Sequence, residues 1–211
     1  MAQLFHIHPE HPQPRLIKQA AEIARSGGLI ALPTDAAYSL AGVAGYAPLL
    51  DRIRSIRGVD ERHLFTLMCR DLSEIATYAR VDNSQYRLLK ATTPGSYTFI
   101  LEGTRELPRR LLHPKRKTIG LRVPNHPLAL ALLAELDEPL LTSTLILPGF
   151  EAPLADADEI RQHLEKQLDL VIDAGHCGME MTTIINLTGT QPELVRAGQG
   201  PLAPFGLDEP V

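Results

Sequence analysis

The chain has 211 residues, of which 44% are hydrophobic and 22% charged, a composition typical of a globular protein that buries a sizeable core. Trp is absent and aromatic residues make up 5%, which disfavours aromatic base stacking as a main mode of binding. The net charge is −4, so the whole chain lacks the basic excess that would by itself indicate nucleic-acid binding.

Helical and extended patterns alternate along the chain. Apolar residues of 16–24 recur at helical spacing, the pair Gly27-Gly28 ends that pattern, and Asp71 with Glu74 has the spacing of a capping box. The predicted helices are 15–24, 48–57, one that begins at Asp71, 128–136 and 156–167. The predicted strands are 29–32, 64–69, 97–101, 118–123, 140–147, 170–173, 183–187 and 193–196.

This alternation predicts the fold class. No linker, repeat or low-complexity tract divides the chain, so we expect one α/β domain over 1–211 with a core of about 12–201. An open, twisted sheet is flanked by helices in this prediction. The last two strands are joined by a turn at 189–192, which indicates a mixed rather than a fully parallel sheet.

The cysteines and the N-terminal stretch bear on the cellular compartment. Cys69 and Cys177 lie far apart without metal-ligand spacing, which disfavours a disulfide framework and fits a reducing compartment. The stretch MAQLFHIHPEHP lacks the basic and apolar regions of a signal peptide. No apolar run approaches the roughly 18 residues of a membrane span. We therefore expect a cytoplasmic protein without a membrane segment.

Basic residues are concentrated between Arg105 and Arg122. This segment contains seven basic residues and one acidic residue, Glu106. Its net charge is therefore +6, which leaves −10 for the rest of the chain. A basic patch on an acidic body suits a polyanion such as nucleotide phosphates or RNA, and a solvated surface loop is the alternative interpretation. The candidate RNA-binding residues are Arg109, Arg110, Lys115, Arg116 and Lys117.

Three predicted strands end in or carry small and polar residues, in the stretches 33–35, 117–122 and 141–144. Ligands of open α/β sheets sit at strand ends, where hydroxyls and Arg side chains hold phosphate or carboxylate. Thr34 and Ser143 serve equally well as local turn or cap partners, but the three stretches together favour one composite site.

The histidines do not indicate a metal centre. His6, His8 and His11 lie in a Pro-rich stretch that no second cluster supports, so we expect no metal site. His63 is expected on a surface loop because it follows charged residues, and His163 is expected to be solvated on a charged helix.

Six stretches in order resemble the motifs of the YrdC/YciO family, whose active members make threonylcarbamoyladenylate for tRNA modification. They are PTDAAYSL at 33–40, PGSYT at 94–98, TIGLRVP at 118–124, TSTL at 142–145, MTTIIN at 181–186 and RAG at 196–198. The similarity covers about 12–201, and FTLMCRDLSE, PRRLL and KRKTIGLRVP are most similar to the YciO branch. The resemblance implies the YrdC-like fold, an open twisted α/β sheet around a positively charged concave surface.

The resemblance also implies a reaction and its site. Active relatives combine L-threonine, bicarbonate and ATP with Mg²⁺ and release pyrophosphate, which is nucleotidyl transfer by positioning and charge neutralisation. It implies that Thr118 contacts the nucleotide, that Arg122 holds the threonine carboxylate beside Ser143, and that Arg196 meets phosphate. The full set of implied binding residues is Thr34, Tyr38, Arg57, Thr118, Arg122, Ser143, Thr182 and Arg196.

Three positions depart from the family pattern. Ala36 replaces a threonine-site Thr, Val59 replaces a cation of the Lys-x-Arg motif, and Leu145 replaces the Asn of Thr-Ser-Ala-Asn. Each lost charged hydrogen bond costs about 1.5–3 kcal/mol, or roughly 10- to 150-fold in binding. Two interpretations follow: a protein that binds nucleotide and double-stranded RNA or tRNA with little synthase activity, or an active threonylcarbamoyladenylate synthase.

Overall fold

The computed structural model describes residues 1–61, 63–113 and 115–207. Within these ranges ten strands form one sheet in the spatial order β1-β8-β2-β3-β7-β4-β6-β5-β9-β10. The strands are β1 (Gln3–His6), β2 (Ile30–Leu32), β3 (Ser39–Val43), β4 (Thr66–Met68), β5 (Tyr97–Glu102), β6 (Thr118–Arg122), β7 (Leu140–Thr144), β8 (Leu170–Asp173), β9 (Thr183–Asn186) and β10 (Glu193–Arg196). Parallel pairs such as β4–β6 and antiparallel pairs such as β3–β7 both occur, which confirms the predicted mixed sheet.

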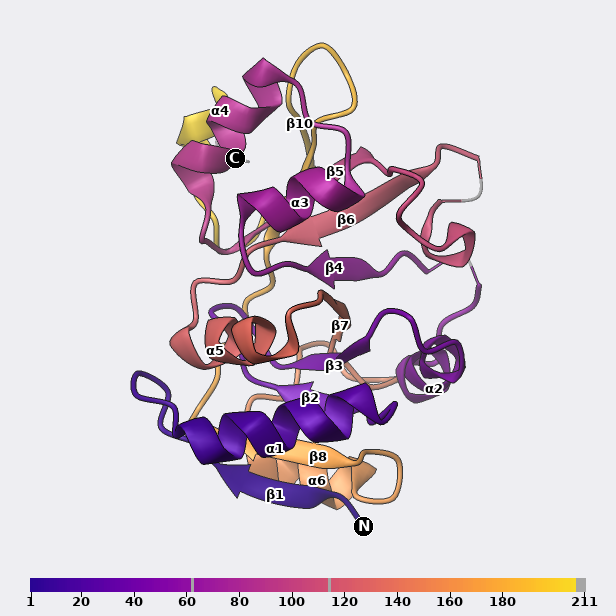
Figure 1. Cartoon of the computed structure of the whole chain (residues 1–211), viewed down its shortest axis with the longest axis vertical. Coiled ribbons are helices and arrows are strands. Elements are labelled where there is room, and N and C mark those ends of the chain that lie inside the picture. The colour runs from indigo at the N-terminus through magenta and orange to yellow at the C-terminus, as the bar shows by residue number, and fades with distance from the viewer. Residues whose placement is uncertain (62, 114, 208–211) are drawn as a thin grey trace.

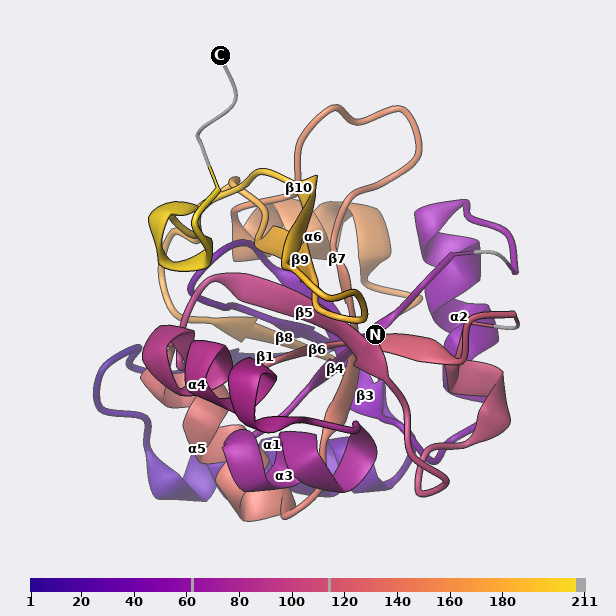
Figure 2. The same ribbon diagram turned by 90° about the horizontal axis from the view of Figure 1, so that it is seen from above.

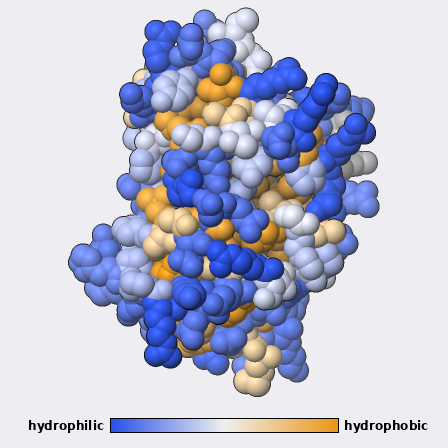
Figure 3. Space-filling model, viewed as in Figure 1, coloured by the Kyte–Doolittle hydropathy of each residue, from blue (hydrophilic) through white to orange (hydrophobic). Residues whose placement is uncertain are grey.

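Most helices cover one face of this sheet (Figure 1). They are α1 (Pro14–Arg25), α2 (Pro48–Arg57), α3 (Leu72–Tyr78), α4 (Asn83–Thr92), α5 (Pro127–Leu136) and α6 (Ala157–Leu164), with short 3₁₀ turns η1 (Arg109–Leu111) and η2 (Ala203–Phe205). Figure 2 shows α1, α3, α4 and α5 on one side of the sheet and α6 on the other. The outer surface of the helical face is largely hydrophilic, with apolar atoms visible between the polar side chains (Figure 3).

The helices form where the sequence supplies an apolar face. Helix α1 has Pro14 at its first turn, where a missing N–H costs nothing, and it buries Ala20, Ala21 and Ala24. These small side chains allow α1 to pack against α5, which buries leucines such as Leu132 in the same cluster. Burial of each leucine contributes roughly 1.5–3 kcal/mol, so this cluster fixes one half of the sheet's helical layer.

Three elements were not predicted: β1, β3 and α4. The segment of β3 is rich in small residues, which have a weak preference for strands, yet it pairs with both β2 and β7. Helix α4 does carry a local signal, because Asp82 and Gln85 form a complete capping box in which each side chain bonds the other's backbone N–H. The predicted helix 156–167 is shorter than expected and ends at Leu164.

The strand order brings the polar stretches of β6 and β7 close together, with only β4 between them. The register places Thr142 of β7 opposite Thr66 of β4, and Thr66 opposite Gly120 of β6. A Cβ on Gly120 would lie 3.1 Å from Thr98 Cγ2 and 3.3 Å from Thr66 Oγ1, so glycine leaves room between these two threonines. This row of hydroxyls crosses the middle of the sheet.

Candidate anion-binding site

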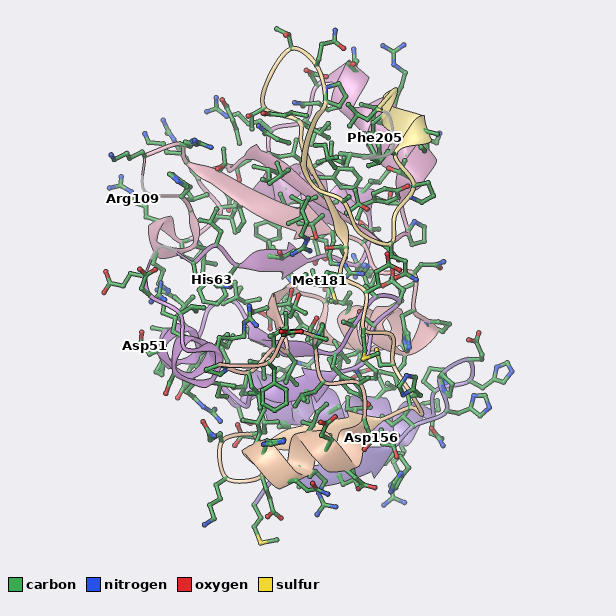
Figure 4. The ribbon with its side chains drawn as sticks, turned by 180° about the vertical axis from the view of Figure 1, so that it is seen from behind. Asp51, His63, Arg109, Asp156, Met181 and Phe205 are labelled. Atoms are coloured by element: carbon green, nitrogen blue, oxygen red, sulfur yellow. The ribbon has the colours of Figure 1, made fainter. Side chains whose placement is uncertain are left out.

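A pocket of about 120 Å³ lies over this row of hydroxyls, and we call it the arginine pocket. Three guanidinium groups line it, those of Arg57, Arg122 and Arg196, together with the imidazole of His63. Hydroxyl side chains supply most of the remaining polar lining: Ser39, Thr66, Thr98, Thr142, Ser143, Thr144 and Thr182. None of the described lining residues carries a carboxylate. Figure 4 shows His63 and Met181, which also lines the pocket, near the middle of the face opposite the one seen in Figure 1.

Two of the three arginines are held by main-chain carbonyl groups rather than by acids. Arg57 is the last residue of α2, and its Nη1 donates to the carbonyl of Ile146 at 2.7 Å. On β10, Arg196 donates from Nη2 and Nε to the carbonyl of Thr182 at 2.8 and 3.2 Å. Burial lowers the pKa of both guanidinium groups, although arginine stays protonated at physiological pH. Main-chain carbonyl groups thus hold both cations at the pocket, and these contacts do not neutralise their charge.

The third arginine, Arg122, has an internal carboxylate partner. It is 4% exposed at the end of β6, and its Nη2 donates to Asp35 Oδ1 at 2.5 Å. The other oxygen of Asp35 accepts a hydrogen bond of 2.8 Å from the Ser96 hydroxyl. Burial lowers the pKa of Arg122, while the charge of Asp35 and the hydrogen bond to it act in the opposite direction. The Nε of Arg122 is buried without a partner among the described residues, so the guanidinium retains a donor.

His63 lies in a loop, as expected, but it is half-buried there and lines the arginine pocket. Its Nε2 lies 3.2 Å from the Ser143 hydroxyl, and its ring packs edge-on against Phe65 with 5.2 Å between ring centroids. Burial lowers the pKa of His63, and the positive charges of Arg57 and Arg54 lower it further. No local sequence signal identifies this residue, because its role depends on α2 and β7 folding against its loop.

Five of the eight implied binding residues converge on the arginine pocket: Arg57, Arg122, Ser143, Thr182 and Arg196. Among the lining residues, Ser39, Thr66, Thr98 and His63 were not singled out as binding residues from the sequence. The three threonine or serine positions lie in strands whose side-chain direction becomes known only from the register.

The other three implied residues do not line this pocket. Tyr38 is fully buried in the core, where its hydroxyl donates to the carbonyl of Ile172 at 2.9 Å. Thr34 closes a local turn, in which its Oγ1 donates to the carbonyl of Ala37 at 2.7 Å. Thr118 is buried at the start of β6, where its carbonyl accepts from the His113 N–H.

The three departures from the family pattern also have definite places. Ala36 is 3% exposed in the turn beside Asp35, and Leu145 is fully buried in the main hydrophobic cluster. Val59 follows α2 and is not among the residues that line the arginine pocket. A polar side chain at position 145 of this chain would therefore be buried in the hydrophobic core.

The five basic residues implicated in RNA binding are all exposed: Arg109, Arg110, Lys115, Arg116 and Lys117. They lie between β5 and β6, and Figure 4 shows Arg109 at the outer edge of the molecule, apart from Met181. Arg110 donates to the carbonyl of Gly45 at 2.9 Å, which ties this segment to the end of β3. The basic segment is thus a surface feature separate from the arginine pocket.

The described part of the chain offers no cluster of three or more His, Cys, Asp or Glu side chains placed to hold a metal ion. His6 instead bonds Asp173 through Nδ1 at 2.9 Å, and the rings of His8 and His11 stack with centroids 5.2 Å apart. None of the helices in the described ranges has the length and apolar character needed to cross a membrane.

The sequence matches the Sua5/YciO/YrdC family model, described as telomere recombination, over residues 22–198. YciO of Escherichia coli (strain K12) is 54% identical over 205 residues, which are 97% of this chain and 100% of YciO. A threonylcarbamoyl-AMP synthase of Halorhodospira halophila (strain DSM 244 / SL1) is 28% identical over 178 residues, 84% of this chain and 92% of the synthase.

Solved structures show the same fold. The crystal structure of E. coli YciO superposes with a TM-score of 0.93 and covers 97% of this chain and 100% of its own. The crystal structure of P. abyssi Sua5 complexed with L-threonine superposes with a TM-score of 0.87 at 24% identity, over 95% of this chain and 58% of Sua5. These matches confirm the resemblance that the six motifs indicated. The chain belongs to the Sua5/YciO/YrdC family and is related to its threonylcarbamoyl-AMP synthases.

Proposed function

We propose that the protein binds a nucleotide through phosphate in the arginine pocket and performs little or no threonylcarbamoyl-AMP synthesis. One observation carries this proposal: Arg57, Arg122 and Arg196 converge on one pocket whose described lining includes no carboxylate. A planar guanidinium group can donate two parallel, charge-assisted hydrogen bonds to two oxygens of one phosphate. A phosphate group would supply the negative charge that this lining lacks.

The size of the arginine pocket limits which part of the ligand enters it. Its volume of about 120 Å³ is well below the ~300–1,000 Å³ of common ligand pockets. A phosphate or a carboxylate fits this space, and the base and ribose of a nucleotide would lie outside it on the open face of the sheet. Mg²⁺ would arrive bound to the nucleotide phosphates, because the described lining has no carboxylate to hold it.

Weak synthase activity is supported by the residues around the arginine pocket. The side chain of Ala36 has no hydroxyl for threonine, Leu145 is committed to the core, and Val59 brings no second cation to the lining. Arg122, which the family resemblance assigns to the threonine carboxylate, already bonds the carboxylate of Asp35. A threonine ligand would have to share this guanidinium or displace Asp35.

Calorimetric titration with ATP and AMP tests the binding proposal. Arg196→Gln removes a guanidinium from the lining, and we expect it to weaken ATP binding about tenfold or more. Arg87→Gln is the matched control, because Arg87 is exposed on α4 and outside the lining, and its ATP affinity should equal that of the parent. Absence of ATP binding in the parent protein, or equal loss in both variants, would reject the proposal.

An active synthase is the second candidate function. It is favoured by the convergence of Arg57, Arg122, Ser143 and Arg196 on one pocket and by the relationship to a threonylcarbamoyl-AMP synthase. The measurement is pyrophosphate release from ATP and Mg²⁺ with bicarbonate, in the presence and absence of L-threonine. We expect no threonine-dependent release above background. Clear threonine-dependent release that Arg196→Gln abolishes would establish the synthase instead.

The exposed basic segment supports a further part of the proposal, binding of double-stranded RNA or tRNA. Duplex RNA is recognised mainly through shape and phosphate contacts, which basic side chains supply without aromatic residues. Neutralising Arg109, Arg110, Lys115 and Arg116 to Gln should weaken duplex binding and flatten its salt dependence in a gel-shift assay. Equal binding by this variant and the parent would remove the segment from RNA recognition. Because Cys69 and Cys177 are both buried and free, we place this activity in the reducing cytoplasm.

A further inference from the structure

A second pocket lies under the segment that links β5 to β6, and we call it the loop pocket. It encloses about 760 Å³, within the ~300–1,000 Å³ typical of small-molecule sites. None of its described lining residues lines the arginine pocket. The sites are therefore separate, and a ligand in one does not require a ligand in the other.

Cations surround the loop pocket. Arg80, Arg105, Arg109 and Lys117 line it, and none of the described lining residues is acidic. Arg80 pairs with Glu102, but the closest atoms are 3.9 Å apart and both side chains are exposed, so this pair neutralises little charge. Four positive charges around one cavity favour an anionic ligand.

His113 adds a further hydrogen-bonding group. Its Nδ1 accepts hydrogen bonds from the backbone N–H groups of Lys115 and Arg116 at 3.2 and 3.0 Å. An imidazole that accepts at Nδ1 carries its hydrogen on Nε2. Because His113 lines the loop pocket, its remaining hydrogen-bonding atom is a donor, which again suits an anion.

Besides Thr104, the rest of the lining is apolar and closely packed. Leu107 and Leu112 line the cavity with Gly103, and a Cβ on Gly103 would approach Leu112 Cδ2 far inside contact distance. Gly103 N–H donates to the carbonyl of Lys117 at 3.0 Å, and Lys117 has the uncommon φ of 56°. These contacts hold Lys117 and the leucines at one cavity, and positive φ at a non-glycine residue is often retained for function.

We propose that the loop pocket binds a small phosphomonoester that carries an apolar or aromatic group. The cations and the His113 donor would hold the phosphate, and Leu107 and Leu112 would contact the apolar group. A solvent-exposed patch for nucleic acid would not need an apolar cavity, so the lining favours a small molecule over a polyanion at this pocket. Duplex RNA remains an outcome that the experiment below can identify.

Phenyl phosphate is the test ligand, and inorganic phosphate and phenol are its charge-only and apolar-only counterparts. Binding is measured by calorimetry and by amide chemical shifts of Gly103, His113 and Lys117 in the full chain. We expect phenyl phosphate to bind more tightly than either counterpart. Arg109→Gln with Lys117→Gln should weaken it about tenfold or more. Leu112→Ala should weaken phenyl phosphate but leave inorganic phosphate unchanged.

Lys115→Gln with Arg116→Gln is the matched control, because it removes the same charge from the same segment but neither residue lines the loop pocket. Its affinity for phenyl phosphate should stay within about twofold of the parent. Equal weakening by the two double variants, or a duplex RNA that binds while phenyl phosphate does not, overturns the proposal. Arg196→Gln in the arginine pocket should leave the Gly103 shifts intact, which separates this result from the fate of the nucleotide proposal.

Discussion

At the scale of single residues, the pair Asp35–Arg122 joins the core of the protein to its arginine pocket. Both side chains are almost completely buried, at 8% and 5% exposure, and Ser96 holds the second oxygen of the carboxylate. The Ser96 hydroxyl is the donor of this second contact, at 2.8 Å. The carboxylate thus holds Arg122 from behind the pocket lining, to which Asp35 itself does not belong.

Replacing Asp35 with Asn should destabilise the protein strongly. The change leaves the buried guanidinium of Arg122 without a compensating charge, for which we expect a loss of about 3 kcal/mol or more in the free energy of unfolding. Urea denaturation measures the loss. Ser96→Ala is the graded control, because it removes one hydrogen bond and should cost only about 1–2 kcal/mol. A smaller effect for Asp35→Asn than for Ser96→Ala would contradict the assigned ion pair.

His63 predicts a pH dependence of anion binding. In the free protein burial and nearby arginines lower its pKa below the ordinary value of about 6.5, so the ring is neutral at pH 7. A bound anion favours the protonated ring and raises its pKa, and the complex then holds more protons than the free protein. Affinity for sulfate, which does not titrate near neutrality, should therefore increase as the pH falls from about 7.5 to about 5.

Calorimetry with sulfate across this pH range measures the effect. His63→Gln should flatten the profile and retain the binding at pH 7.5. If that variant keeps the full pH dependence, the titrating group is not His63 and the pH argument fails.

At the scale of elements, the packing of α2 on β3 positions Arg57. A Cβ on Gly42 of β3 would lie 2.7 Å from Leu49 Cδ1 and 3.1 Å from the carbonyl of Gly28, so glycine permits this close approach. Leu49 is in the first turn of α2, and Arg57 is the last residue of the same helix. The position of one glycine therefore influences a guanidinium at the far end of the helix.

Gly42→Ala should weaken both stability and binding. Overpacking of this contact should cost about 1–3 kcal/mol in the free energy of unfolding, and the shifted α2 should reduce ATP affinity. Gly189→Ala is the matched control, since the space around Gly189 is open to 3.6 Å and it lies in the turn between β9 and β10. Denaturation and calorimetry on both variants check the prediction. A Gly42→Ala protein that is destabilised but binds ATP with normal affinity would refute it.

The elements also show what the sequence could reveal. Helix α1 was predictable because its apolar spacing and Gly27-Gly28 are local signals, and the Asp82–Gln85 capping box of α4 was equally local but was overlooked. Strand β3 was not predictable, since its small residues have weak strand preference and its two partners are far away in sequence. The position of β8 between β1 and β2 likewise depends on long-range pairing.

The same distinction applies to the site. Motif resemblance identified Arg57, Arg122 and Arg196 because the residue types themselves are retained. It did not predict that Tyr38 lies in the core and outside the pocket lining, since a motif does not say which side of a strand end faces the core. The place of His63 in the pocket lining was not predicted, because its environment is made by residues distant in sequence, including Ser143.

At the scale of the whole molecule, two histidines should make folding sensitive to acid. Burial lowers the pKa of His63 and of His126, whose Nδ1 is buried without a partner among the described residues. The unfolded chain then binds protons more readily than the folded protein near pH 6.5. The contribution of these two histidines to the free energy of unfolding is therefore fully present above about pH 6.5, and it declines as the pH falls through that value.

The loss should not exceed about 1.4 kcal/mol per pH unit for each histidine. Urea midpoints at several pH values between about 7.5 and 5.5 measure it. His126→Gln should reduce this pH dependence, and an unchanged slope in that variant would assign the acid sensitivity to other groups.

The strand order has a consequence for the growing chain on the ribosome. Strand β8, residues 170–173, lies between β1 and β2, so residues 3–6 find their partner only after most of the protein has been synthesised. Until then β2 presents an open edge to solvent, and unpaired edges attract other nascent chains. Translation that stops before residue 170 should thus yield aggregation-prone fragments, and late completion of this edge ties productive folding to the release of nearly the entire polypeptide.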